Sequence, residues 1–342
     1  MHRDTSAASR LAGGAAATES RGTMRCSARG PARESELLLT ARSGAFRMAL
    51  ARLEKLAAFD EATILLLGES GTGKTVLAQH LHDRSPRARR IFHRVALSSI
   101  ADTLAPSELF GHVPGAFTDA RTRRAGHFAV ADGGTLFLDE LGKASELVQH
   151  KLLDAIERKE VTPLGADQPT RVNVRLVTAT NVCLDRLVDE GRFLPDLAAR
   201  LEGFAVTIPP LRARRDDIPA LVDHLAGVHG SSFGYPAGPP AWEPELLDVM
   251  RDAAWPNNIR QLESTVCALM IEAAGAPVIL RRHCTTAMVQ LKPARRRGQM
   301  DAEVVQEALR NNESKAMLAR KLGVSRSTLY RHLDALPAPR AD

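Results

Sequence analysis

Residues 68–75 combine the residue types and the spacing of a loop that wraps around phosphate groups. They fit the pattern G-x-x-x-x-G-K-[ST], in which glycines let backbone N–H groups turn inward and a following helix adds partial positive charge. Lys74 would reach the β and γ phosphates of a nucleotide, and Thr75 would ligate Mg²⁺. The predicted phosphate-binding residues are Gly68, Glu69, Ser70, Gly71, Thr72, Gly73, Lys74 and Thr75.

The elements that such a loop requires lie on both sides of it. Residues 63–67 are a short apolar run, typical of a strand that is buried on both faces of a parallel sheet. Residues 76–82 place Val76, Leu77 and Leu81 at helical spacing. A Gly-rich turn that joins a strand to a helix by chance is the alternative, and the presence of both flanking elements disfavours it.

Two adjacent acids follow a second apolar run. Asp139 and Glu140 come directly after residues 135–138. We expect Asp139 to bind Mg²⁺ through water and Glu140 to polarise the attacking water as a general base. Solvated turn residues are the alternative, but the phosphate loop requires an acidic partner of this kind. ATP and Mg²⁺ are therefore the expected cofactors.

The rest of the pattern predicts an α/β fold followed by helices. Further strands are expected at residues 91–95, 172–177 and 204–208, and helices at 34–59 and 146–159. Alternating strands and helices predict a parallel sheet that binds its ligand at the carboxyl ends of the strands. After Pro209 and Pro210 we expect helices only, at 218–228, 243–250 and 258–273, which would form a small lid.

Composition and charge exclude some classes of protein. Aromatic residues make up only 4% of the chain, which disfavours a single-strand nucleic-acid binder because such a binder needs stacking platforms. The net charge is +6, whereas residues 281–342 alone hold 13 Lys and Arg against 6 Asp and Glu. This basic region suggests a nucleic-acid partner, although a merely solvated surface is the alternative.

Cysteines and the N-terminal residues indicate the compartment. Cys26, Cys183, Cys267 and Cys284 form no C-x-x-C pair, so we expect neither a disulfide framework nor a zinc site. No apolar run approaches the roughly 18 residues of a membrane helix, and no secretory signal is indicated. We therefore expect a cytoplasmic protein with no membrane partner. Residues 1–33 are interpreted as a flexible tail, with a transit peptide or an over-extended translation start as alternatives.

The last residues predict a helix-turn-helix. A helix is expected at 301–310, a second is capped by Ser314 and ended by Gly323, and a third starts at Ser325. The third helix would enter the major groove of DNA, with Arg326 and Arg331 as the best candidates for phosphate or guanine contacts. A small helical protein-binding bundle is the alternative. The candidate DNA-binding residues are Ser325, Arg326, Ser327, Thr328, Tyr330 and Arg331.

Several motifs together carry a family resemblance. They are GESGTGKT at 68–75, ELFGH at 108–112, GAFTDA at 115–120, GGTLFLDE at 133–140 and PPLR at 209–212. In this combination the chain resembles the bacterial enhancer-binding proteins, AAA+ ATPases that activate sigma-54 RNA polymerase. The resemblance covers about residues 35–335 and its motifs are highly specific in combination. It implies an α/β fold class: an AAA+ P-loop parallel sheet with a helical lid, followed by an all-α, Fis-type helix-turn-helix domain.

The resemblance also assigns a contact with the sigma factor. It implies that the GAFTDA loop touches the sigma factor through Phe117 and Thr118. The family usually has Gly where this chain has Asp119, an exchange that removes a residue free to take positive φ and adds a negative charge. A plain surface loop is the alternative for Phe117.

The resemblance assigns further residues to nucleotide sensing. It implies that Thr180 and Asn181 are the first sensor of the γ-phosphate, and that Arg260 is the second sensor, reaching from the lid. Of two arginines that would reach a neighbouring subunit's ATP, the second is Arg200, while the first position holds Leu194. A surface ion pair is the alternative for any one arginine.

Two details qualify these roles. Arg192 lies two residues before Leu194, and the sequence leaves open whether it substitutes for the missing arginine. Ala96 stands where the family usually has an Asn that holds the catalytic glutamate. The loss of that amide would release Glu140 from this restraint.

Five segments are expected. They are a tail at 1–33, an AAA+ α/β ATPase subdomain at 34–210, a helical lid at 211–290, a linker at 291–300 and the helix-turn-helix domain at 301–342. The 1–33 tail is too short for a sensory receiver domain, so control by expression level, a partner or DNA is expected.

The sequence therefore predicts a sigma-54-dependent transcriptional activator. It would bind upstream double-stranded DNA, assemble from dimers into a homo-oligomeric ring, and use ATP hydrolysis to remodel the closed sigma-54 RNA polymerase complex. The alternative, suggested by Asp119, Leu194 and Ala96, is a diverged ATP-binding and DNA-binding regulator that no longer activates polymerase. An AAA+ chaperone or protease subunit is a third class, which the C-terminal helices disfavour.

Overall fold

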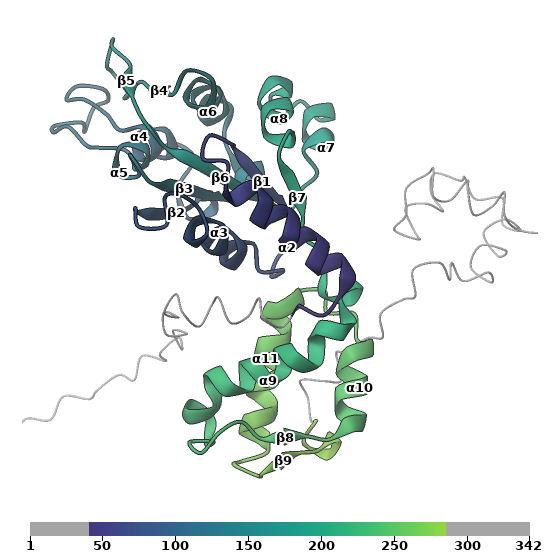
Figure 1. The fold of residues 1–342 in the computed structure, drawn as a ribbon. Coiled ribbons are helices and arrows are strands. Elements are labelled where there is room, and N and C mark those ends of the chain that lie inside the picture. The colour runs from purple at the N-terminus through teal and green to yellow at the C-terminus, as the bar shows by residue number, and fades with distance from the viewer. Residues whose placement is uncertain (1–40, 285–342) are drawn as a thin grey trace, which may run out of the picture.

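The computed structural model describes residues 41–284, which form an α/β unit and a smaller, mainly helical unit, with α2 extending toward the second (Figure 1). The strands are β1 Ile64–Leu67, β2 Phe92–Ala96, β3 Thr135–Asp139, β4 Glu160–Val161, β5 Thr170–Arg171, β6 Arg175–Thr180, β7 Ala205–Thr207, β8 Ala241–Trp242 and β9 Val278–Ile279. The helices are α2 Gly44–Ala57, α3 Lys74–Asp83, α4 Ala105–Phe110, α5 His127–Val130, α6 Glu146–Arg158, α7 Leu184–Asp189, α8 Pro195–Glu202, α9 Ile218–His229, α10 Pro244–Asp252 and α11 Asn258–Glu272.

The main sheet has five strands in the order β2-β3-β6-β1-β7, and every neighbouring pair is parallel. The predicted parallel α/β sheet is thus confirmed. Because all the strands run the same way, their carboxyl ends meet at one edge. Leu67, the last residue before the phosphate loop, lies in register with Thr180, and Asp139 lies in register with Ala96.

Helices cover both faces of this sheet, as its apolar strands require. On one face α2 and α3 pack on a core that includes Leu66, Leu77 and Phe137. On the other face a second core includes Leu138 of β3 and Leu152 of α6. Both faces are buried because residues along each strand point alternately to opposite sides, and both sets are apolar.

The fourth predicted strand is displaced. We expected it at residues 172–177, but β6 spans Arg175–Thr180. The residues just before it belong to another ladder, in which Thr170 and Arg171 of β5 pair with β4. The register with β3 starts where Thr135 faces Arg175, whose buried guanidinium donates to the carbonyls of Leu56, Ala57 and Phe59 at the end of α2. Val172 and Val174 are apolar and buried in the core although they precede β6, so a run of apolar residues places the strand too early.

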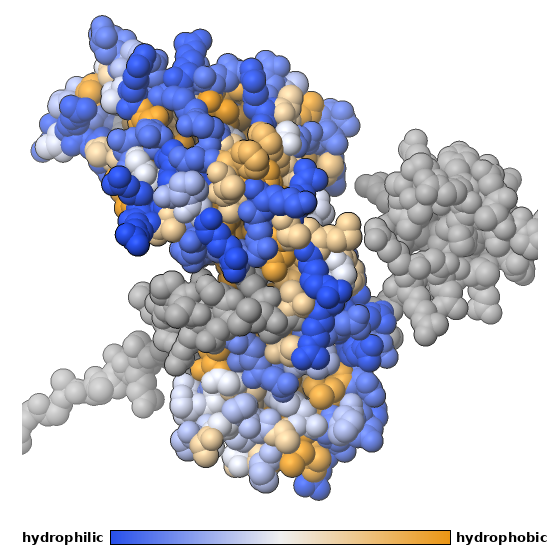
Figure 2. All heavy atoms as spheres, viewed as in Figure 1, coloured by the Kyte–Doolittle hydropathy of each residue, from blue (hydrophilic) through white to orange (hydrophobic). Residues whose placement is uncertain are grey.

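The second unit is the lid. Helices α9, α10 and α11 surround a core that contains Leu225, Met250, Trp255 and Leu262. The expectation of helices only was wrong here, because β8 and β9 pair in parallel. Two-residue strands are too short to show an alternating pattern in the sequence. Figure 2 shows mainly hydrophilic side chains over the visible face of both units, interrupted by small apolar patches.

Candidate functional site

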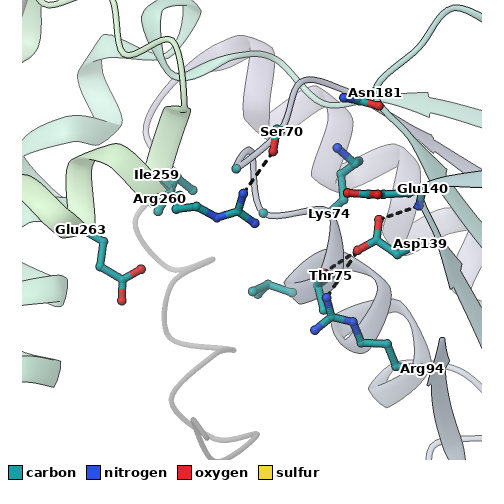
Figure 3. Close-up of a pocket in the computed structure, with 13 residues that line it drawn as sticks. Ser70, Lys74, Thr75, Arg94, Asp139, Glu140, Asn181, Ile259, Arg260 and Glu263 are labelled. Carbon is teal, nitrogen blue, oxygen red and sulfur yellow. Dashed lines mark hydrogen bonds and ion pairs between the residues drawn. The ribbon is translucent and has the colours of Figure 1, made fainter. Parts of the chain in front are cut away.

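A cavity lies where the phosphate loop, the ends of β3 and β6, and the start of α11 meet (Figure 3). It collects side chains that are far apart in the sequence, because the parallel strands end at the same edge. Its lining residues are Ser70, Gly71, Gly73, Lys74, Thr75, Val76, Arg94, Asp139, Glu140, Asn181, Ile259, Arg260 and Glu263.

The phosphate loop has the backbone shape that the motif requires. Gly71 and Gly73 have φ of 75° and 98°, in the left-handed region that favours glycine, and Gly73 directly precedes α3. The Lys74 amine donates to the carbonyls of Gly68 at 2.7 Å and Glu69 at 3.0 Å. Burial lowers the pKa of Lys74, whereas Asp139 and Glu140 act in the opposite direction. Phosphate oxygens would favour its charged form.

Thr75 and Asp139 offer a pair of oxygens for a divalent cation. The Thr75 hydroxyl lies 3.5 Å from Oδ2 of Asp139, and Oδ1 accepts a hydrogen bond from the backbone N–H of Glu140 at 3.0 Å. Hydroxyl and carboxylate oxygens suit Mg²⁺, which also keeps water and phosphate ligands. The residues therefore fit the expected ion.

Glu140 forms an ion pair with Lys143, a residue that was not predicted from the sequence. Its backbone has a φ of 59°, uncommon outside glycine, and its carboxylate lies 2.7 Å from the Lys143 ammonium. Hydrogen bonding from Lys143, then from the Ser98 hydroxyl, lowers the pKa of Glu140. The side chain of Ala96, which lies in register with Asp139, is a methyl group and cannot form a hydrogen bond with the carboxylate of Glu140. In this chain Lys143, and not an Asn at position 96, therefore contacts the carboxylate of Glu140.

The lid closes the other side of the cavity and is bonded to the phosphate loop. Arg260 donates to the Ser70 hydroxyl at 3.2 Å, and the N–H of Ile259 donates to the carbonyl of Gly71 at 2.9 Å. Asn258 has a φ of 52°, is completely buried, and donates to the Ser70 carbonyl at 2.9 Å. The lid therefore contacts the loop through its backbone as well as through the predicted second sensor.

The segment that leads into the lid contacts the same loop through two arginines. Arg212 binds both carboxylate oxygens of Glu69, with 2.7 Å between Nη1 and Oε2, and this pairing holds the pKa of Glu69 below its usual range. Arg214 donates to the carbonyl of Thr72 at 3.0 Å, and burial lowers the pKa of Arg214 to about 10. Arg212 belongs to the PPLR motif at 209–212, but the sequence assigned it no role, and Arg214 was not named.

The two residues of the predicted first sensor have different environments, and only one of them lines the cavity. Asn181 lines the cavity. Thr180 is buried, and its hydroxyl accepts the backbone N–H of Val182 at 3.2 Å, so it shapes the turn after β6.

The predicted arginines for a neighbouring subunit do not line the cavity. Arg200 pairs with Glu157 at 2.9 Å, and Arg192 pairs with Glu190 at 3.1 Å. Leu194 packs against the core of the α/β unit and offers no charge.

The predicted sigma-contact loop lies between α4 and α5. Its stem is fixed by paired backbone bonds of 3.1 Å between His112 and Arg124. At the tip the ring of Phe117 lies 5.0 Å from the His112 ring and is 42% exposed, and Thr118 and Asp119 are exposed too. Asp119 does not take a positive φ, so what distinguishes it in this structure is its charge.

Several residues of the site were not predicted from the sequence. Arg94 and Glu263 line the cavity and Lys143 contacts Glu140. Arg94 could have been found from the sequence, because a charged residue is unusual within a strand of a buried parallel sheet and therefore indicates a functional or structural role. The predicted DNA-binding residues 325–331 lie outside the described residues.

Three family models match successive parts of the chain. The Sigma-54 interaction domain matches residues 39–207, the AAA+ ATPase lid domain residues 212–301, and the bacterial regulatory protein, Fis family, residues 296–336. Among residues 41–284, no helix is long and apolar enough to cross a membrane.

Relatives with these domains share substantial identity. The chain is 46% identical over 203 residues to the Nif-specific regulatory protein of Azotobacter vinelandii, covering 59% of this chain and 38% of the relative. It is 39% identical over 293 residues to the transcriptional regulatory protein ZraR of Klebsiella oxytoca, covering 81% and 64%. It is 43% identical over 219 residues to the DNA-binding transcriptional regulator NtrC of Salmonella typhimurium, covering 64% and 46%.

A solved structure has a similar fold. NtrX from Brucella abortus in complex with ATP superimposes with a TM-score of 0.67 at 27% identity, covering 89% of this chain and 71% of NtrX. The chain spans only 38 to 64% of the length of the three sequence relatives. The successive domain matches, together with the P-loop, the paired acids and the lid described above, place the chain in the family of sigma-54-dependent bacterial enhancer-binding proteins.

Proposed function

We propose that the chain is an ATPase that activates transcription by sigma-54 RNA polymerase. The observation that supports this most directly is one cavity that unites Lys74, Thr75, Asp139 and Glu140 in a sigma-54 interaction domain. The proposal includes cytoplasmic location, because the chemistry requires polymerase and promoter DNA.

The residues of the cavity that were predicted from the sequence have the following roles in this proposal. Lys74 binds the β and γ phosphates, Asn181 contacts the γ-phosphate or the attacking water, and Glu140 accepts a proton from that water. Arg260 brings the lid to the phosphates. Mg²⁺ bound with ATP would be held by Thr75 and, through water, by Asp139, and would neutralise phosphate charge.

The partners follow from the other parts of the chain. Phe117 and Thr118 contact the sigma factor, and the helix-turn-helix at 301–342 binds upstream double-stranded DNA. Dimers on DNA assemble into a ring in which Arg200 reaches the neighbouring nucleotide, which requires Arg200 to leave Glu157. The proposed domain boundaries are 34–210 for the α/β subdomain, 211–290 for the lid, 291–300 for the linker and 301–342 for the DNA-binding domain.

Reconstituted transcription tests this function. Purified full chain is mixed with Mg-ATP, sigma-54 polymerase and a sigma-54 promoter, and open complexes are measured beside phosphate release. The wild type should give both, and Lys74→Ala should give neither. Wild-type protein that neither binds nor hydrolyses Mg-ATP contradicts the proposal.

One observation favours a second function. Leu194 is half-buried against the core and offers no guanidinium, which a subunit needs to neutralise phosphoryl charge in its neighbour. The alternative is a regulator that binds ATP and DNA without activating polymerase. ATP binding without open complexes in the same assay supports this alternative, whether or not some hydrolysis remains.

A further inference from the structure

Arg94 is a charged residue on a strand of the main sheet that faces the nucleotide cavity. It lies in β2, its side chain is 51% exposed, and its neighbour Val95 points into the core on the opposite side. Figure 3 shows its guanidinium beside Thr75 and Asp139.

The contact that Arg94 makes leaves most of its hydrogen-bonding capacity unused. Nη2 lies 3.4 Å from Oδ2 of Asp139, which is a single, long contact and not a bidentate pair. A guanidinium carries five N–H donors, and within residues 41–284 this is the one hydrogen bond found for the Arg94 side chain. The remaining donors are available to a ligand.

The position of this contact defines which end of the nucleotide Arg94 would meet. Oδ2 of Asp139 is also the oxygen that lies 3.5 Å from the Thr75 hydroxyl. In P-loop ATPases the residues that hold the metal lie beside the β and γ phosphates. A guanidinium next to Asp139 is therefore at the phosphate end of the cavity, away from the lid residues Ile259 and Glu263.

We propose that Arg94 binds the terminal phosphate of ATP within its own subunit and is a catalytic residue. The inference rests on the proposed ATPase function. A planar, permanently charged fork suits phosphate oxygens and can neutralise the charge that develops on them during hydrolysis. Lys74 from the loop, Arg260 from the lid and Arg94 from β2 would then approach the phosphates from three directions.

Nucleotide affinities test the proposal directly. Binding of ATPγS and of ADP, each with Mg²⁺, is measured by calorimetry for wild type, Arg94→Ala and Arg94→Lys. We expect Arg94→Ala to weaken ATPγS binding about tenfold, as loss of one charged hydrogen bond does, while ADP binding changes less than about twofold. The turnover number should fall about tenfold or more, and Arg94→Lys should recover part of both losses.

A matched control removes the same charge elsewhere. Arg89 is exposed, lies before β2 and does not line the cavity. Arg89→Ala should leave both affinities and turnover at wild-type values.

Three outcomes overturn the proposal. If Arg94→Ala weakens the binding of ATPγS and of ADP equally, Arg94 contributes only positive electrostatic potential to the cavity and does not contact the terminal phosphate. Unchanged ATPγS binding means that it has no phosphate contact. Tighter binding with a lower Mg²⁺ requirement means that Arg94 merely competes with the metal for Asp139. Failure of the wild type itself to bind any nucleotide instead contradicts the proposed ATPase function.

Discussion

The nucleotide cavity and the loop at residues 112–124 belong to the same α/β unit but are held in different ways. In the cavity, hydrogen bonds from Ile259 and Asn258 of the lid and from Arg214 of the segment before it hold the backbone of the phosphate loop. In the loop, paired backbone bonds fix the stem at His112 and Arg124, while the tip around Phe117 is exposed. The difference suggests that chemistry needs fixed groups, whereas partner contact needs an accessible tip on a fixed base.

The largest expected effect is in the cavity. Glu140→Gln removes the carboxylate that takes up the water's proton but keeps nearly the same shape, so turnover should fall about 10²- to 10⁴-fold. Affinity for ATPγS should stay within a few fold of wild type. Phosphate release and calorimetry measure the two quantities. Near-normal turnover would remove Glu140 from the mechanism.

The stem should be the sensitive part of the loop. A Cβ at Gly126 would clash with the backbone of Phe110 and Gly111, whereas a Cβ at Gly115 would meet open space. Gly126→Ala should therefore lower the free energy of unfolding by about 2 to 3 kcal/mol. Gly115→Ala should cost only about 1 kcal/mol, because its φ of 83° is unfavourable for Ala. Thermal unfolding midpoints of the full chain compare them, and similar midpoints would contradict a fixed stem with an open tip.

The tip should affect coupling and not hydrolysis. Phe117→Ala removes an exposed ring that contacts the His112 ring and does not line the cavity, so ATP turnover should remain within about twofold of wild type. Open-complex formation should fall about tenfold or more, as expected for loss of an aromatic contact at an interface. A parallel loss of both activities would show that the tip supports the cavity. Thr122→Ala, at an exposed position of the same loop, is the matched control.

The smallest expected effect concerns the ion pair between Glu69 and Arg212. The folded state lowers the pKa of Glu69, mainly through Arg212, so this pair stabilises the fold above the ordinary Glu pKa near 4.5 and loses its contribution as the pH falls through the lowered value. Because both side chains are about 40% exposed, Glu69→Gln should cost less than about 1 kcal/mol at pH 7.

Urea unfolding at several pH values measures this cost. The difference between wild type and Glu69→Gln should be constant near neutral pH and shrink below about pH 4.5. A difference that grows on acidification would contradict the assigned sign.

The parts of the site that the sequence predicted are those set by local spacing. Lys74 and Thr75 follow β1, and Asp139 and Glu140 end or follow β3, so a parallel sheet alone brings them to one edge. Asn181 reaches the cavity for the same reason, since it follows β6.

The parts that could not be predicted depend on contacts between distant segments. Arg94 reaches Asp139 only because β2 pairs with β3 in one particular register, with Ala96 opposite Asp139. The bond of Asn258 to the phosphate loop joins residues 188 positions apart. The start of β6 was predicted three residues too early because Val172 and Val174 are buried in the core without belonging to the strand.

The bonds between the lid and the phosphate loop restrict how the molecule can move. Ile259 holds the carbonyl of Gly71, and Arg214 holds that of Thr72, so the lid cannot swing far without pulling on the backbone that surrounds the phosphates. Release of a spent nucleotide would then be coupled to reorientation of the lid. We therefore expect occupancy of the nucleotide cavity to change the position of the lid.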